Sequence, residues 1–100
     1  MAIKNEAIQK IRSQYNYLSS EFDVERIGLF GSVASETDNE KSDIDLLVEL
    51  RRPMGLKFIR LAEYLERILG RKVDLITSEG LKNIRVREVA EDIRRTLIYV

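Results

Sequence analysis

Two aspartates, Asp43 and Asp45, stand two positions apart at the start of the apolar run DIDLLVEL, residues 43–50. In a β-strand, side chains two positions apart leave the same face, about 6 to 7 Å from each other. Two carboxylates that close repel each other, and a cation between them removes the repulsion. The pair can therefore bind one or two metal ions, while the simpler interpretation is an exposed strand start where Asp ends a loop.

A third carboxylate, Asp74, lies inside a shorter apolar run, VDLIT, residues 73–77. A carboxylate among strand residues needs a partner, a metal ion or a face that is open to water. Taken alone, Asp74 is best explained by an edge strand that exposes it. Taken with Asp43 and Asp45, it is the candidate third member of a metal-binding group.

Gly31 and Ser32 lie between an apolar run and a predicted helix start. A glycine lets the backbone approach a ligand closely, and the N–H groups of the following turn, with the Ser32 hydroxyl, can seat a phosphate. The alternative is an ordinary strand-to-helix turn with Ser32 as its N-cap. Carboxylates that hold metal ions and face a phosphate seat are suited to displacement at a phosphoryl group.

The residue types that are absent narrow the chemistry further. The chain has no Cys and no His, which excludes thiolate nucleophiles, disulfides, cysteine metal sites and histidine bases. Any catalysis must rely on carboxylates, hydroxyls, Lys or Arg. A metal ion must have mainly oxygen ligands, which favours Mg2+.

Length and composition indicate one ordinary globular domain over residues 1–100, because 44% hydrophobic and 34% charged residues suit one modest core. Lys and Arg number 17, and so do Asp and Glu, which argues against broad nucleic-acid binding. No apolar run approaches the ~20 residues of a membrane span, and the first residues lack the apolar core of a signal peptide. We therefore expect a cytoplasmic protein without a membrane partner.

Helical and strand patterns alternate along the chain, which predicts an α/β or α+β fold with a sheet covered by helices. Ser19 and Ser20 are expected to break the first helix, Gly70 to close the central helix, and Ser78 to cap the segment after the third strand. The expected elements are helices over 4–19, 32–35 and 58–69, a final helix that contains Val86, Val89, Ala90 and Ile93, strands over 26–30, 43–50 and 73–77, a polar loop over 36–42, and a short strand or helix end over 97–100.

The strand over 43–50 carries apolar side chains on both faces. Leu47 shares the face of Asp43 and Asp45, so that face is not simply exposed to water. The alternate residues are expected in the core: Ile44, Leu46 and Val48.

The final helix is rich in arginine, but acidic residues are interleaved with the basic ones. This pattern predicts a water-exposed helix face with local ion pairs, while contact with a nucleotide or with an acidic patch of a partner is the alternative. The basic residues are Arg85, Arg87, Arg94 and Arg95, and the acidic ones are Glu88, Glu91 and Asp92.

Gly31-Ser32 followed after ten residues by Asp43-x-Asp45 resembles the signature of the minimal nucleotidyltransferases, which are relatives of the DNA polymerase beta superfamily. The Leu-Leu-Val-Glu that follows, the Leu-Gly-Arg-Lys-Val-Asp-Leu-Ile-Thr stretch with Asp74, and the basic final helix are also similar to that family. The resemblance extends over residues 8–100.

The resemblance implies a role for each of these residues. Asp43 and Asp45 would hold the metal ions that bind the triphosphate of ATP, expected to be two Mg2+ ions. Asp74 would complete the site and help to deprotonate the incoming hydroxyl, and Gly31 and Ser32 would hold the terminal phosphates. The chain departs from the family pattern in one place, because Ser35 and Glu36 stand where Arg-Gly is common.

A hundred residues hold a catalytic core and little more, so the acceptor is expected on a separate protein, in a hetero- or homo-oligomer. The resemblance implies a helical toxin of the HEPN class as the partner and transfer of AMP from ATP to one of its tyrosines, which makes the chain an antitoxin. Two alternatives stay open. One is an antitoxin that neutralises by binding alone, and the other is a catalytic subunit that modifies a small-molecule hydroxyl.

Overall fold

A four-stranded mixed sheet forms the frame of the molecule. In the computed structural model, which describes residues 3–39, 41–53 and 55–100, the strands lie in the order β3-β2-β1-β4. Strand β1 is antiparallel to both β2 and β4, and β2 is parallel to β3. The strands are β1 (Val24–Phe30), β2 (Ile44–Leu50), β3 (Val73–Thr77) and β4 (Ile98–Tyr99).

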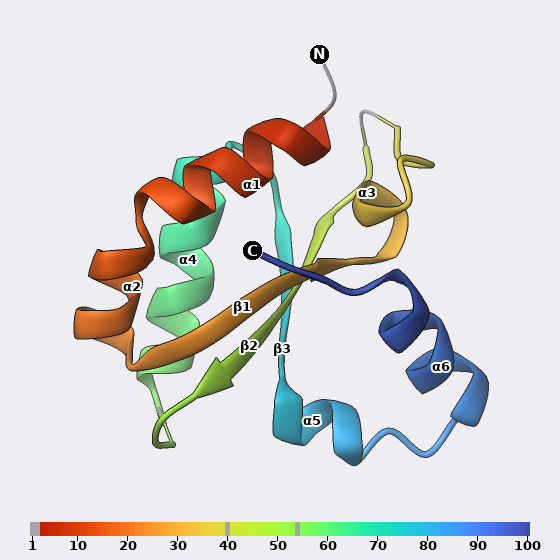
Figure 1. Ribbon diagram of the computed structural model, residues 1–100. Helices are drawn as coiled ribbons and strands as arrows, with labels where there is room; N and C mark the ends of the chain where they lie inside the picture. The colour runs from red at the N-terminus through yellow and green to blue at the C-terminus, as the bar shows by residue number, and fades with distance from the viewer. Residues whose placement is uncertain (1–2, 40, 54) are drawn as a thin grey trace.

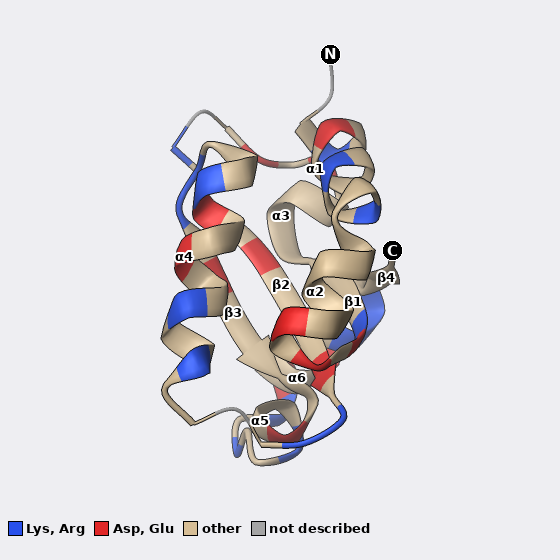
Figure 2. Ribbon diagram, turned by 90° about the vertical axis from the view of Figure 1, so that its left-hand side faces the viewer, with Lys and Arg blue, Asp and Glu red and all other residues tan. Residues whose placement is uncertain are grey.

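Helices cover both faces of this sheet, with α1, α2 and α4 on one side and α5 and α6 on the other (Figure 1). Figure 2 shows the first group in front of the strands. The main core joins this group to Ile44, Leu46 and Val48 of β2, and a smaller core joins Leu47 to residues of α5 and α6. The helices are α1 (Ile3–Ser13), α2 (Tyr15–Phe22), α3 (Gly31–Ala34), α4 (Lys57–Leu69), α5 (Ser78–Lys82) and α6 (Arg87–Thr96).

These observations confirm the predicted fold class and the two-sided burial of β2. A strand covered on both faces is apolar at nearly every position. The acidic pair accordingly lies where β2 begins, with Asp43 just before the strand and Asp45 as its second residue. Helix α4 also ends as predicted, at Gly70 in the left-handed region with φ +70. None of the described helices is both long and apolar enough to span a bilayer.

The first helix differs from the prediction, because it is two helices that meet at Gln14. Ser19 and Ser20 lie inside α2 and do not break it. The Ser20 hydroxyl donates to the Asn16 carbonyl at 3.0 Å, so it bonds back along the helix and leaves the backbone helical. Helix α2 ends instead at Asp23, whose φ of 55 places it in the left-handed region.

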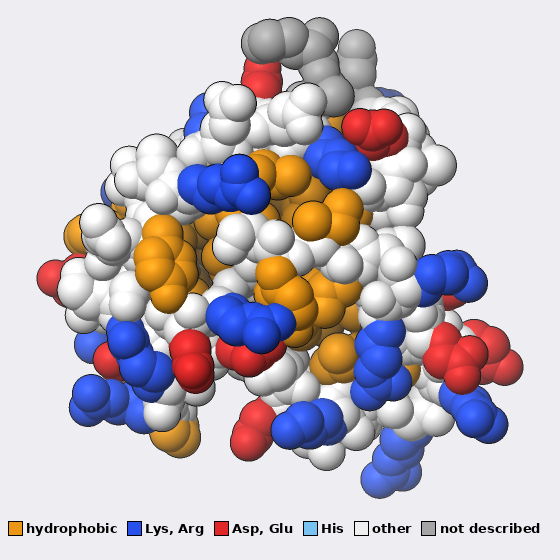
Figure 3. All heavy atoms as spheres, in the orientation of Figure 1, with side chains coloured by type: hydrophobic (Ala, Val, Ile, Leu, Met, Phe, Trp, Pro, Cys, Tyr) orange, Lys and Arg blue, Asp and Glu red, His pale blue; other side chains and the backbone are white. Residues whose placement is uncertain are grey.

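In the last third of the chain, the cap of helix α5 differs from the prediction, and the final segment adopts one of its two expected forms. Helix α5 is capped by Thr77 and not by Ser78, because the Thr77 hydroxyl accepts a hydrogen bond from the Gly80 N–H at 2.9 Å. The final segment is a strand, β4, which pairs with β1. On the face drawn in Figure 3, Lys, Arg, Asp and Glu side chains of both signs surround a central group of apolar side chains.

Candidate active site

The sheet register brings two of the predicted site residues side by side. Asp45 pairs with Phe30 on β1 and with Asp74 on β3, and neighbouring strands lie about 4.8 Å apart. Asp43 stands immediately before β2. Asp45 is half-buried, while Asp43 and Asp74 are exposed. The three carboxylates therefore gather at one end of β2 and β3.

The electrostatics of Asp45 show that the other two carboxylates act on it. Burial, and after it the charges of Asp74 and Asp43, together raise the pKa of Asp45 from 3.8 to about 6. A cation at this position would offset that repulsion.

Gly31 lies directly against the carboxylate of Asp45. Its φ is +75, and a Cβ at this position would overlap Oδ2 of Asp45 and lie 3.0 Å from Cγ. Only glycine allows this backbone conformation and this close approach at low cost. The contact was not visible in the sequence, because Gly31 opens α3 and Asp45 belongs to β2.

The environment of Gly31 also narrows the predicted phosphate seat. The Gly31 N–H donates to Oγ1 of Thr96, at the end of α6, at 3.0 Å. The seat would thus consist of the Ser32 hydroxyl and the N–H groups after it. Phe30 occupies the N-cap position of α3, so the interpretation of Ser32 as an N-cap is wrong.

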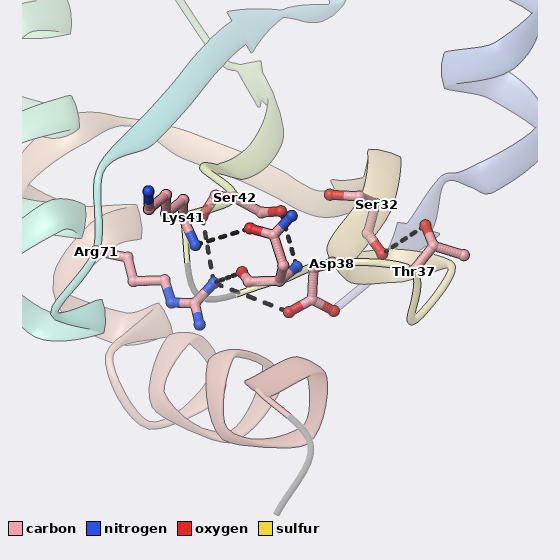
Figure 4. A network of polar contacts seen from close by, with 7 residues as sticks. Ser32, Thr37, Asp38, Lys41, Ser42 and Arg71 are labelled. Carbon is pink, nitrogen blue, oxygen red and sulfur yellow. Dashed lines mark hydrogen bonds and ion pairs between the residues drawn. The ribbon is translucent and has the colours of Figure 1, made fainter.

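Arg71, which the sequence did not single out, holds the loop that leads to Asp43 (Figure 4). Its guanidinium donates to the carbonyls of Asn39 and Ser42 at 3.1 and 3.2 Å and pairs with Asp38 at 3.8 Å. Its partners lie about thirty positions earlier in the chain, and no local pattern indicates such contacts. Arg71 thus positions the segment before β2 against the start of β3.

A hollow of about 410 Å3 lies at the C-terminal ends of β2 and β3, away from the three aspartates. Its walls include Arg51, Arg52, Phe58 and Thr77, and none of the three gathered aspartates lines it. Size alone would favour this hollow as a site. We place the candidate site at the aspartates, because the groups that could perform chemistry are there.

Comparison with known proteins decides the family. The model of a nucleotidyltransferase domain matches residues 11–99. The chain belongs to this nucleotidyltransferase family. The resemblance seen in the sequence is confirmed, and the chain is a nucleotidyltransferase.

Relatives of this nucleotidyltransferase match most or all of its length. One from Methanocaldococcus jannaschii, named "putative protein adenylyltransferase", is 39% identical over all of both chains. Another from the same organism, with the same name, is 41% identical over 90% of both. "Protein adenylyltransferase MntA" of Thermococcus cleftensis is 42% identical over 83% of this chain and 81% of its own.

Solved structures agree on the fold of the nucleotidyltransferase. A "putative minimal nucleotidyltransferase" superposes with a TM-score of 0.71 at 30% identity, over 98% of this chain and 95% of its own. A toxin–antitoxin structure with AMP-PNP has a TM-score of 0.63 at 23% identity, over 96% of this chain and 70% of its own. The second likeness shows a shared fold.

The donor groups of this nucleotidyltransferase suit a hard cation. Among residues 3–39, 41–53 and 55–100, no three acidic, Cys or His side chains form a ready metal-binding group. Mg2+ in nucleotide enzymes is usually bound by one or two carboxylates together with substrate phosphates. The aspartates therefore fit an ion whose coordination the substrate completes, and they do not form a closed protein cage.

The raised pKa of Asp45 gives a prediction for the metal-free protein. We expect the Asp45 carboxyl to titrate near pH 6 in a carbon-13 NMR titration, since burial, Asp74 and Asp43 all raise its pKa. Asp74→Asn should lower that pKa, because it removes one repelling charge. Glu63→Gln, on the other side of the sheet, should leave it unchanged. A pKa of Asp45 near its ordinary value of 3.8 would contradict the placement of Asp45 in a half-buried position close to Asp43 and Asp74.

The same shift sets the sign of a stability change with pH. The unfolded chain loses this proton near pH 3.8 and the folded chain near pH 6, so between these values the folded state binds more protons. The contribution of Asp45 to stability is therefore present at low pH and is lost as the pH rises through this window. Urea denaturation at several pH values should show this loss in the wild type and not in Asp45→Asn.

Proposed function

We propose that this nucleotidyltransferase transfers AMP from ATP to a tyrosine hydroxyl of a partner toxin of the HEPN class, and that it acts as the antitoxin. The observation that carries this proposal is the packing of Gly31 against the Asp45 carboxylate, beside Asp74. Two relatives, one named "putative protein adenylyltransferase" and one named "protein adenylyltransferase MntA", support the choice of reaction and of a protein acceptor.

The transfer has a simple balance of bonds. The tyrosine oxygen forms a bond to the α-phosphorus of ATP, the bond between that phosphorus and the bridging oxygen breaks, and pyrophosphate leaves. The hydroxyl proton must go to a base. The chain has no His, and we assign this role to Asp74, the exposed carboxylate beside Asp45.

The other residues would bind and orient the substrate. Asp43 and Asp45 would hold Mg2+, which when bound supplies charge neutralisation for the phosphates and the leaving group. Ser32 and the N–H groups after it would contact the terminal phosphates, and Gly31 would keep Asp45 in place. The half-burial of Asp45 lowers the local polarity and strengthens its electrostatic interactions.

The alternative of an antitoxin that neutralises only by binding has one observation in its favour. Ser35 and Glu36, which follow α3, stand where the family pattern commonly has Arg-Gly. These two positions therefore supply no basic side chain near Ser32. Against it, a binding surface gains nothing from carboxylates that repel one another or from a glycine held at φ +75. A third function, modification of a small-molecule hydroxyl, would use the same residues and differ only in the acceptor.

Calorimetric titration of ATP with Mg2+ tests the proposed site. Wild-type protein should bind ATP only with Mg2+ present, because the phosphates and the aspartates repel each other without it. An Asp43→Asn, Asp45→Asn double variant should lose this binding, and Glu63→Gln should keep it. Equal binding by the double variant and the wild type would rule out these aspartates as the metal-dependent site.

A further inference from the structure

A hollow of about 350 Å3 lies between α3 and α6, next to the candidate site. One wall consists of the segment around α3, with Gly31, Ser32 and Ser35, and the other of α6, with Val89, Asp92 and Arg95. Phe30, the ladder neighbour of Asp45, also lines it. The hollow is thus continuous with the residues proposed to seat the phosphates.

Arg95 is the one cation among the described residues that line this hollow. Its backbone is held through the next residue, Thr96. The Thr96 hydroxyl accepts a hydrogen bond from the Gly31 N–H at 3.0 Å and donates one to the Asp92 carbonyl at 2.9 Å. The last turn of α6 is therefore tied to the start of α3. The Arg95 side chain stays within reach of the space beside Ser32.

The partner of Arg95 in the structure is weakly held. The guanidinium pairs with Asp92, three residues earlier, and the two side chains are 74% and 62% exposed. An ion pair this exposed contributes little to stability and exchanges readily. A phosphate carries more charge than a carboxylate and matches the planar fork of the guanidinium.

We infer that Arg95 is a phosphate-binding residue of the nucleotide site, which leaves Asp92 and binds a β- or γ-phosphate oxygen of ATP in the hollow beside Ser32. This inference rests on the proposed function and adds a basic residue to a proposed site that otherwise consists of carboxylates, a hydroxyl and backbone N–H groups. Three aspartates gather beside the phosphate seat, so a triphosphate needs positive charge on its other side. The exposed Asp92 carboxylate is the anion that a phosphate would replace at the guanidinium.

A purely local role for Arg95 is the competing explanation. A basic residue in the last turn of a helix interacts favourably with the free carbonyls there. Arg94 lies in the same last turn of α6 as Arg95. Arg94 is also exposed, but it does not line the hollow. Arg94→Ala is therefore the matched control for the loss of a C-terminal charge.

The test compares ATP and AMP affinities, with Mg2+, in the full chain and its variants. Arg95→Ala should weaken ATP binding about tenfold, the loss expected for one charge-assisted hydrogen bond at a partly exposed site. AMP binding should not change, because AMP lacks the β- and γ-phosphates. Arg94→Ala should leave both affinities within about twofold of wild type, and Arg95→Lys should recover part of the loss.

Asp92→Asn gives a result of the opposite sign. It removes the anion that competes for the guanidinium, so ATP should bind about two- to threefold more tightly. The inference is overturned if Arg95→Ala matches Arg94→Ala, if ATP and AMP weaken equally, or if Asp92→Asn weakens ATP. If the wild-type protein does not bind ATP with Mg2+, the proposed function is overturned as well. If the wild type binds ATP and Arg95→Ala binds it with the same affinity, this inference alone is overturned.

Discussion

Replacement of Asp45 by asparagine is expected to reduce nucleotidyl transfer by about a thousandfold or more, the scale of losing one preorganised electrostatic group at a phosphoryl-transfer site. Asparagine has the same shape, so the contact with Gly31 and the sheet register should survive. Release of pyrophosphate from ATP in the presence of the proposed partner toxin is the measurement.

The same variant should fold and should be more stable than the wild type at pH 7. The ionised Asp45 is half-buried and repelled by Asp74 and Asp43, and asparagine removes that cost. For a carboxylate this open to solvent, we expect a gain of about 1 kcal/mol in the free energy of unfolding. A stable, folded Asp45→Asn that transfers AMP at the wild-type rate would contradict the role of Asp45, and Glu63→Gln should change neither quantity.

Gly31→Ala is expected to abolish transfer as well, through the position of Asp45 and not through its charge. The new Cβ would overlap Oδ2 of Asp45, so the carboxylate must turn away or the two strands must separate. Together with the cost of an alanine at φ +75, this should lower the free energy of unfolding by about 2 to 4 kcal/mol. Urea denaturation and pyrophosphate release measure the two effects on the same sample.

Gly70→Ala separates the two causes. Gly70 has nearly the same backbone conformation, φ +70, but no atom of the described residues lies within 4 Å of a Cβ built there. It should lose only about 1 to 2 kcal/mol, the cost of the left-handed conformation, and keep full activity. Equal activity in Gly31→Ala and Gly70→Ala would show that the contact between Gly31 and Asp45 has no part in catalysis.

Most of the fold could be predicted from local patterns. The apolar periodicity gave α4 and its end at Gly70, and the short apolar runs gave β1, β2 and β3. The break of the first helix could not be predicted, because burial of Leu18 and Phe22 and the back-bonding of Ser20 favour helix where serines alone suggest a stop. Side-chain packing decided this position, and propensity did not.

The site shows the same division between local and long-range information. The two-residue period of a strand predicted a common face for Asp43 and Asp45. Their proximity to Asp74 depends on the parallel register of β2 and β3, which a single sequence does not specify. The hydrogen bond from Gly31 to Thr96 spans 65 positions, so neither it nor the placement of Arg95 could be found before the fold was known.

The most direct test of the proposed transfer is the intact mass of the proposed partner toxin after incubation with this chain, ATP and Mg2+. The toxin should gain the mass of AMP, peptide mapping should place it on a tyrosine, and pyrophosphate should form in equal amount. Asp45→Asn should give an unmodified toxin. An unmodified toxin with the wild-type chain, although the toxin is bound and neutralised, would contradict the account and leave an antitoxin that acts by binding alone.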